Sequence, residues 1–169
     1  PTARKVAAGG AEKVKFIHEN KYPINQVLLQ EYLSGGAKTL YSYGVYAENG
    51  EPQAWIMANR IRQNPMDFGN STTFAITCKI PEIEEAARKI LSATKYTGLA
   101  EIEFMYDEKD GVFKFLEINT RAWKWHSISE AFGWGFMSEL IFNKNGANSE
   151  FVDSDSRKAW VERLTDFAV

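Results

Sequence analysis

The residues best suited to bind a ligand or take part in a reaction lie in two short runs between positions 99 and 121. Ile102-Glu103-Phe104 sets one carboxylate between apolar residues, and Leu116-Glu117-Ile118-Asn119-Thr120-Arg121 adds a second carboxylate, an amide and a guanidinium. Carboxylate and amide oxygens suit a hard cation such as magnesium, and arginine binds phosphate or carboxylate through a planar fork. The two runs therefore indicate chemistry on a metal ion and an anionic substrate.

Residues 99–105 and 112–119 are expected to form the two strands of a β-hairpin. Alternation in the first strand puts Glu103 on the face opposite to Ile102 and Phe104. In the second strand, the face that carries Glu117 is expected to include Phe113, Phe115 and Asn119.

The turn of this hairpin decides which side chains face each other. A three-residue turn, Lys109-Asp110-Gly111, sets Glu103 opposite Glu117 and Glu101 opposite Asn119. A two-residue turn would set Glu103 opposite Ile118, but Gly at the third loop position favours the longer turn. Facing carboxylates lie about 5 Å apart and repel unless solvent or a cation separates them. Alternation alone fits both a magnesium site and a solvated face with ordinary surface glutamates.

The same two runs resemble the metal-binding signature of ATP-grasp enzymes, such as carbamoyl-phosphate synthetase, D-alanine–D-alanine ligase and biotin carboxylase. In that superfamily a glutamate on one strand and a Glu-x-Asn motif followed by arginine bind one or two magnesium ions on the phosphates of ATP. The resemblance implies ATP and Mg²⁺ (or Mn²⁺) as cofactors. It makes Glu103, Glu117 and Asn119 metal ligands and gives Arg121 a catalytic place at the phosphates.

Upstream, Leu28-Leu29-Gln30-Glu31-Tyr32-Leu33 resembles the hinge whose backbone receives the adenine ring in the superfamily. The resemblance implies that four residues bind the nucleotide: Gln30, Glu31, Tyr32 and Leu33. The phosphate-binding lysine of the superfamily would fall just before Pro1, and Lys5 is the candidate substitute. An amino-terminal lobe that helps to bind the acceptor would then be missing from this chain.

Two arginines lie between these landmarks. The run from Asn59 to Pro65, with Phe68-Gly69, is similar to a stretch of carboxylate–amine ligase-like members of the superfamily. If the run is extended, Arg60 and Arg62 share a side, with Arg60 on the nucleotide and Arg62 in catalysis. Two surface arginines beside a loop fit the pattern equally well.

The residues after Arg121 depart from the biotin carboxylase pattern. They are Ala122-Trp123-Lys124-Trp125-His126, where biotin carboxylases have a Gln and a Glu for bicarbonate. Bicarbonate chemistry is therefore not expected. Core packing is the favoured role for at least two of Trp123, Trp125 and Trp134, and a hydrogen-bonded structural role is favoured for His126.

The elements that must position these residues indicate an α+β fold with antiparallel sheets and flanking helices, as in ATP-grasp proteins. Further strands are expected over residues 14–17, 26–33, 41–47, 53–59 and 74–78, with a polar loop over 62–73. Helices are expected from Pro81 and near 127–132, 136–142 and 158–167. The resemblance implies that residues 1–35 belong to the small nucleotide-binding lobe and 36–169 to the core with the metal site.

Composition narrows the class of partner. The 169 residues include 20 Lys and Arg and 22 Asp and Glu, a formal net charge of -2. This balance gives no basic face for nucleic acid. No apolar run approaches the ~20 residues of a membrane span. Cys78, the single cysteine, is expected to fill the core. We therefore expect a cytoplasmic protein without nucleic-acid or membrane partners.

The resemblance implies an ATP- and magnesium-dependent carboxylate–amine ligase, in which ATP converts a substrate carboxylate into an acyl-phosphate that an amine attacks. Small carboxylates and amines would be its substrates. Two alternatives stay open. One is a non-catalytic or split-enzyme fragment that binds ATP and needs a partner chain, as a homodimer or with an amino-terminal lobe supplied in trans. The other is a plain interaction domain with solvated carboxylates.

Overall fold

A computed structural model describes residues 33, 35–64, 71–132 and 157–162. The chain divides into two compact units, residues 1–34 and 35–169, and every described helix and strand belongs to the second unit. The predictions for the strands before residue 33, for Lys5, for the hinge residues Gln30, Glu31 and Tyr32, and for a helix over 136–142 lie outside the described residues. Leu33 is half-buried and has no regular secondary structure.

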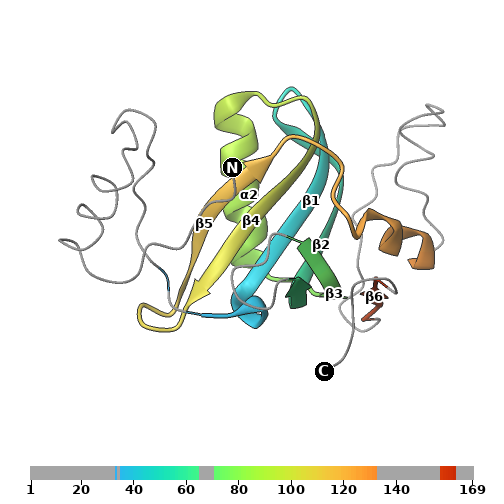
Figure 1. The fold of residues 1–169 in the computed structure, drawn as a ribbon. Coiled ribbons are helices and arrows are strands. Elements are labelled where there is room, and N and C mark those ends of the chain that lie inside the picture. The colour runs from blue at the N-terminus through green and yellow to red at the C-terminus, as the bar shows by residue number, and fades with distance from the viewer. Residues whose placement is uncertain (1–32, 34, 65–70, 133–156, 163–169) are drawn as a thin grey trace, which may run out of the picture. The chain divides into compact units, whose positions relative to one another are not determined.

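One six-stranded antiparallel sheet organises the described part, in the order β5-β4-β1-β2-β3-β6 (Figure 1). The strands are β1 (Leu40–Glu48), β2 (Glu51–Asn64), β3 (Ser71–Thr77), β4 (Gly98–Asp107), β5 (Val112–Asn119) and β6 (Ala159–Val161). The helices are α2 (Pro81–Thr94) and two 3-10 helices, η2 (Ala37–Thr39) and η3 (His126–Phe132). The predicted α+β class with an antiparallel sheet and a flanking helix is confirmed.

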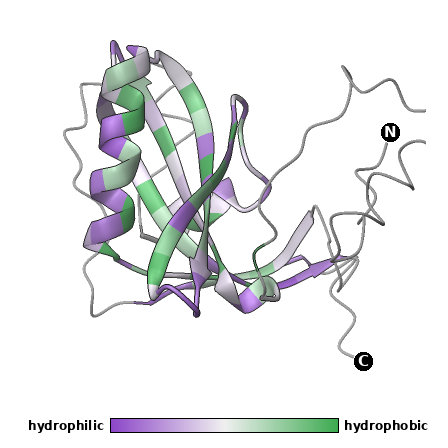
Figure 2. Ribbon diagram, turned by 90° about the vertical axis from the view of Figure 1, so that its left-hand side faces the viewer, coloured by the Kyte–Doolittle hydropathy of each residue, from purple (hydrophilic) through white to green (hydrophobic). Residues whose placement is uncertain are grey.

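The two faces of this sheet have different covers. Helix α2 packs its buried residues Ile83, Ala87 and Leu91 on one face, which we call the helix face. Figure 2 shows the hydrophobic side of α2 turned toward the sheet and its hydrophilic side turned outward. The opposite face is covered by Trp123, Trp125 and Ile128, which follow β5, and we call it the tryptophan face. Period-two alternation sorts the strand residues between these two covers.

The β1–β2 hairpin turns at Asn49-Gly50. Both residues have positive φ, 48° and 87°, which is the backbone of the two-residue turn that matches strand twist. The turn is held to the β4 side of the sheet because Gly50 N–H donates to the Tyr96 carbonyl at 2.8 Å. Asn49 N–H donates to the Thr97 hydroxyl at 2.8 Å.

Two predicted elements are wrong because strand pairing overrides local sequence preference. Residues 62–64 and 71–73, expected in a loop, extend β2 and β3, which pair as far as Asn64 and Ser71. A helix was expected from residue 158, but Ala159–Val161 forms β6 on the edge of β3. Lys158 N–H donates to the Thr77 hydroxyl at 2.8 Å and fixes the start of that pairing. The helix near residue 127 is present as η3.

Candidate functional site

The β4–β5 hairpin places Glu103 opposite Glu117 and Glu101 opposite Asn119, as predicted. The turn length that was predicted to produce this register is wrong. Asp107 pairs with Val112, so the loop holds four residues, 108–111, rather than three. One extra β5 residue then lies between the pairs Phe104–Phe115 and Glu103–Glu117. This β-bulge shifts the register by one residue and brings the two carboxylates face to face.

Asp107 explains the longer loop. Its carboxylate accepts a hydrogen bond from Lys109 N–H at 3.0 Å, and its carbonyl accepts one from Gly111 N–H at 2.8 Å. Gly111 has φ 69°, a left-handed conformation that glycine adopts without steric cost. The Lys114 ammonium lies 2.7 Å from the Asp107 carboxylate, and this contact closes the end of the hairpin.

The bulge also changes which β5 residues share a face. Phe115 lies against Phe104 and Phe113 against Tyr41, with ring centroids 6.2 Å and 5.2 Å apart. Phe104 and Tyr41 belong to the helix-face core. The prediction that Phe113 and Phe115 share a face with Glu117 is therefore wrong, because the extra residue in β5 reverses the alternation beyond it.

Three predicted metal ligands meet on the tryptophan face. Asn119 Nδ2 donates to Glu117 Oε1 at 3.0 Å and to Glu103 Oε1 at 3.4 Å. We call Glu103, Glu117 and Asn119 the carboxylate cluster. Glu103 is mostly buried, whereas Glu117 is exposed, so one side of the cluster is open to a ligand from solvent.

Arg60 joins the carboxylate cluster from β2. Its Nη2 lies 2.9 Å from Glu103 Oε1, and the two side chains are only 6% and 12% exposed. The contact spans β1, where Ser42 lies between the two strands and pairs with Glu103. Burial raises the pKa of Glu103, the Arg60 guanidinium lowers it, and the nearby carboxylates of Glu101 and Glu117 raise it. The net shift is upward, so the site disfavours excess negative charge.

Arg62 does not belong to this cluster, and the prediction that Arg60 and Arg62 share a side is wrong. Arg60 pairs with Ala75 and Arg62 with Phe74, two successive residues of β3. An irregularity at the intervening residue turns Arg62 to the helix face, where its guanidinium lies 4.6 Å from the Phe74 ring centroid. The strand is extended, but a bulge within it removes the simple period of two.

Arg121 follows directly after β5. Its N–H donates to the Asn119 carbonyl at 2.9 Å, and its exposed guanidinium donates to the Ala122 carbonyl at 3.1 Å. The residue is therefore attached through its backbone to one member of the carboxylate cluster, and its side chain is accessible to solvent.

A buried hydrogen bond that sequence reasoning missed lies beside the cluster. Trp125 Nε1 donates to Glu101 Oε1 at 3.0 Å, and Glu101 is 4% exposed. Trp123 and Trp125 are each 1% exposed, so the predicted core role of two tryptophans is confirmed. His126 has the predicted structural role, since its Nδ1 lies 2.6 Å from the Trp123 carbonyl. The one sequence feature that pointed to this contact was Glu101, an acidic residue on the same strand face as Glu103.

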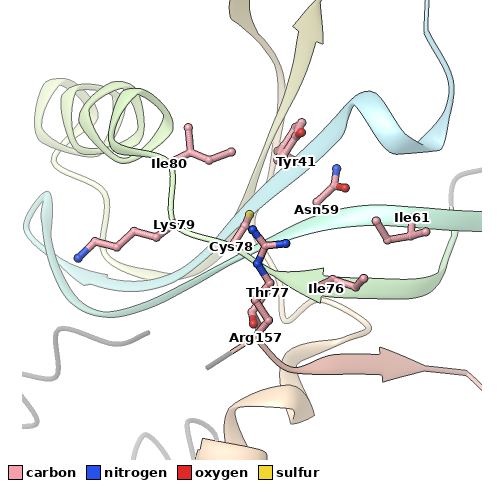
Figure 3. Close-up of a pocket in the computed structure, with 9 residues that line it drawn as sticks. All are labelled: Tyr41, Asn59, Ile61, Ile76, Thr77, Cys78, Lys79, Ile80 and Arg157. Carbon is pink, nitrogen blue, oxygen red and sulfur yellow. The ribbon is translucent and has the colours of Figure 1, made fainter. Parts of the chain in front are cut away.

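A separate pocket of about 360 Å³ lies at the helix face, between Tyr41, Ile61, Ile76 and the segment around Arg157. Figure 3 shows the Arg157 side chain reaching toward Cys78. Burial raises the pKa of the Cys78 thiol to about 12, so this cysteine is an unreactive, protonated group that packs beside the core, as predicted. The lining residues carry cations but no carboxylate, so the pocket is unsuited to magnesium.

The carboxylate cluster has the donor chemistry of a magnesium site. Within the described ranges, no three His, Cys, Asp or Glu side chains gather around one point. Magnesium is usually held by one or two carboxylates and completes its shell with water and substrate phosphate. Two carboxylates and one amide in hydrogen-bond contact fit that pattern. No described helix is long and apolar enough to cross a membrane.

The carboxylate cluster lies in a part of the chain that resembles a known family. The model of the carbamoyl-phosphate synthase L chain ATP-binding domain matches residues 56–138, which include Arg60 and the whole carboxylate cluster. Acetyl-CoA carboxylase 2 from Oryza sativa subsp. japonica is 37% identical over 51 residues, 30% of this chain and 2% of that protein. Acetyl-CoA carboxylase 1 from the same plant is 31% identical over 70 residues, 41% of this chain and 3% of that protein.

Two solved structures share the fold. One is the biotin carboxylase domain dimer of Hydrogenobacter thermophilus 2-oxoglutarate carboxylase, in complex with MgADP, ADP and bicarbonate (TM-score 0.56, 21% identity, 78% of this chain, 31% of that chain). The other is L-amino acid ligase from Bacillus licheniformis (TM-score 0.52, 16% identity, 79% of this chain, 35% of that chain). This chain thus spans only a small part of its relatives. The described part has the ATP-grasp fold, and residues 56–138 resemble an ATP-binding domain of the carbamoyl-phosphate synthase type.

Proposed function

We propose that this chain binds magnesium-ATP over the tryptophan face, as part of a ligase that activates a substrate carboxylate as an acyl-phosphate for attack by an amine. The observation that carries the proposal is the convergence of Glu103, Glu117 and Asn119 within the region matched to an ATP-binding domain. A solvated pair of surface glutamates does not account for this arrangement, because Glu103 is mostly buried and hydrogen-bonded to a buried arginine.

Each residue has a distinct role in this proposal. Glu103, Glu117 and the Asn119 amide oxygen would hold Mg²⁺ (or Mn²⁺), which, when bound, neutralises charge on the transferred phosphoryl group. The chain's own part is to position the phosphates and balance their charge, since phosphoryl transfer needs little covalent help from the protein. Arg60, which contacts Glu103, and Arg121, two residues after Asn119, are the cations that we assign to the phosphates. Arg62 takes no part, because it lies on the helix face.

The remaining nucleotide contacts stay predictions. Gln30, Glu31, Tyr32 and Leu33 would receive the adenine and ribose, and Lys5 would reach the phosphates. The resemblance to the superfamily supports these roles, and no contact of the described residues bears on them.

Trp123 and Trp125 support a carboxylic acid rather than bicarbonate as the activated substrate. Both indoles are buried in the core of the tryptophan face, and the Trp125 N–H is used by Glu101. Apolar rings at these two positions cannot supply the Gln and Glu that serve bicarbonate in biotin carboxylases. The bicarbonate in the Hydrogenobacter complex therefore is not the substrate we propose for this chain.

Calorimetry with magnesium-ATP tests the binding step. Glu117→Ala should weaken binding at least about tenfold, because loss of one charged ligand interaction corresponds to roughly 1.5–3 kcal/mol. Glu108→Ala is the matched control, since Glu108 is an exposed glutamate in the loop of the same hairpin. Absence of magnesium-ATP binding by the parent chain would refute the proposal.

The activation step has its own test. Incubating the chain with ATP, Mg²⁺, hydroxylamine and a panel of carboxylic acids should produce hydroxamates, because hydroxylamine traps acyl-phosphates without knowledge of the natural amine. Binding of magnesium-ATP without any hydroxamate would favour the second candidate, an ATP-binding fragment that needs a partner chain. The observation in favour of that candidate is that this chain covers 31% and 35% of the two solved relatives.

A further inference from the structure

The guanidinium of Arg60 contacts one oxygen of the Glu103 carboxylate, which the proposed function assigns to a metal ion. Arg60 Nη2 is 2.9 Å from Glu103 Oε1, the oxygen that also accepts the long hydrogen bond from Asn119 at 3.4 Å. Both donors therefore direct hydrogens at a carboxylate oxygen that the proposed function assigns to the metal. Glu103 cannot give the same lone pair to magnesium while both contacts persist.

This arrangement is enforced by burial. Arg60 and Glu103 are 6% and 12% exposed, and a buried carboxylate without a partner is costly. Among the described residues, the buried Arg60 Nε has no hydrogen-bond partner. A guanidinium with an unused buried N–H is incompletely satisfied by Glu103 alone and retains a donor for a second anion.

The Asn119 side chain is likewise oriented as a hydrogen-bond donor and not as a metal ligand. Its Nδ2 donates to both Glu117 and Glu103, whereas a metal ligand must offer Oδ1. Asn119 can therefore bind a cation through Oδ1 only after the amide turns over.

We propose that Arg60 is an exchangeable counter-ion: it neutralises Glu103 in the metal-free protein and moves to the nucleotide phosphates when the metal takes Glu103. This inference rests on the proposed function. It predicts that metal alone binds weakly, because it would leave a buried guanidinium without an anion. Metal and nucleotide then bind cooperatively, because the phosphates provide that anion.

Mn²⁺ provides the test, since its free fraction is measured directly by electron paramagnetic resonance. Arg60→Met, which keeps length and removes charge, should bind Mn²⁺ alone at least about fivefold more tightly than the parent. The same variant should bind ATP at least about fivefold more weakly in saturating Mn²⁺. Arg62→Met is the matched control, because Arg62 is two residues away on the helix face, and both affinities should stay unchanged.

The outcomes separate this inference from the proposed function. A parent chain that does not bind Mn-ATP overturns both. A parent that binds Mn-ATP, with an Arg60→Met variant whose affinity for Mn²⁺ alone is unchanged or lower, overturns the counter-ion role only.

A second measurement on the parent guards against misfolding of Arg60→Met. The Arg60 Nε–H resonance, assigned by its loss in Arg60→Lys, should shift on addition of Mg-ATP and stay in place with Mg²⁺ alone. A resonance that Mg-ATP leaves unchanged would overturn the counter-ion role.

Discussion

Two glutamates on β4, two residues apart and on the same face, have different partners. Glu101 is 4% exposed and accepts a hydrogen bond from the Trp125 indole, a rigid neutral donor held in the core. Glu103 accepts its hydrogen bonds from an arginine and an amide at the border of the core. A neutral buried donor fixes structure, whereas a guanidinium beside an exposed glutamate can exchange partners. We therefore propose a structural role for Glu101 and a ligand-binding role for Glu103.

Removing the indole donor tests the structural role of Glu101. Trp125→Phe keeps an aromatic ring and leaves the Glu101 carboxylate buried without this donor, so the free energy of unfolding should fall by about 1–3 kcal/mol. Urea unfolding followed by circular dichroism measures the loss. Glu101→Gln retains an acceptor oxygen and should cost less than Trp125→Phe. An equal or larger loss in Glu101→Gln would show that charge, rather than the indole hydrogen bond, matters here.

At the residue scale, strand alternation together with a family motif was enough to identify the cluster residues from the sequence. Glu103, Glu117 and Asn119 belong to that group, and their meeting on one face is present in the structure. The Trp125–Glu101 hydrogen bond was not predicted, because the indole lies in the non-repetitive segment after β5. No local pattern determines which strand such a segment folds back onto.

At the scale of elements, β1 and the segment after β5 fit together through a glycine. A Cβ on Gly44 would lie 2.3 Å and 2.4 Å from two atoms of the Trp123 ring. The ring therefore occupies the space that a side chain on β1 would need. This contact holds the cover of the tryptophan face against β1, the strand that lies between the one carrying Arg60 and the one carrying Glu103.

Adding one methyl group at this position should disturb the cover. Gly44→Ala requires Trp123 to move, and such overpacking typically costs about 1–3 kcal/mol of stability. Thermal unfolding should show the loss as a lower midpoint. Gly36→Ala is the matched control, because a Cβ there would meet no atom within 4 Å, and its midpoint should be nearly unchanged. Similar midpoints for the two variants would contradict the packing argument.

The end of the β4–β5 hairpin should contribute pH-dependent stability. The hydrogen bond from Lys114, followed by that from Lys109 N–H, lowers the pKa of Asp107 from its ordinary 3.8. A lowered pKa in the folded state means that the stabilisation is present above pH 3.8 and is lost as pH falls through the folded value. Asp107→Asn should therefore be less stable than the parent at pH 7, and the difference should shrink in acid.

Urea midpoints across pH 7 to 2 measure this difference. Asp110→Asn is the control, since Asp110 contacts the same Lys114 ammonium from a more exposed position, 48% against 6% for Asp107. Its effect should be small at every pH. A constant gap between parent and Asp107→Asn over the whole range would contradict the ion-pair origin.

The elements show why a correct register can follow from an incorrect turn. Alternation predicts faces only while each strand residue has one partner, and the bulges in β5 and β2 each add an unpaired residue. In β5 the bulge offsets the longer loop, so Glu103 still meets Glu117. In β2 the register shifts back only after Arg62, so Arg60 and Arg62 separate. Bulges depend on tertiary fit, and the alternation of polar and apolar residues does not reveal them.

At the scale of the whole molecule, the proposed ligand-binding residues are distributed over two units of the chain, and this can be tested. The carboxylate cluster and both hydrophobic cores lie within the unit of residues 35–169. The proposed adenine contacts, Gln30 to Leu33, lie in the unit of residues 1–34. If the two roles are as proposed, phosphate and metal binding belong to one unit and base recognition to the other.

Deleting residues 1–34 should separate these two roles. The remaining chain should still unfold cooperatively, because its described cores are built from residues of its own unit. Its affinity for magnesium tripolyphosphate, which has no base, should stay within about threefold of the parent, well below the 1.4 kcal/mol that corresponds to tenfold. Its preference for magnesium-ATP over magnesium tripolyphosphate should be lost. Calorimetry with both ligands measures the two affinities, and circular dichroism confirms folding.

A folded 35–169 chain that still prefers ATP would place base recognition elsewhere. One that binds neither ligand would show that the carboxylate cluster needs the first unit to bind phosphate.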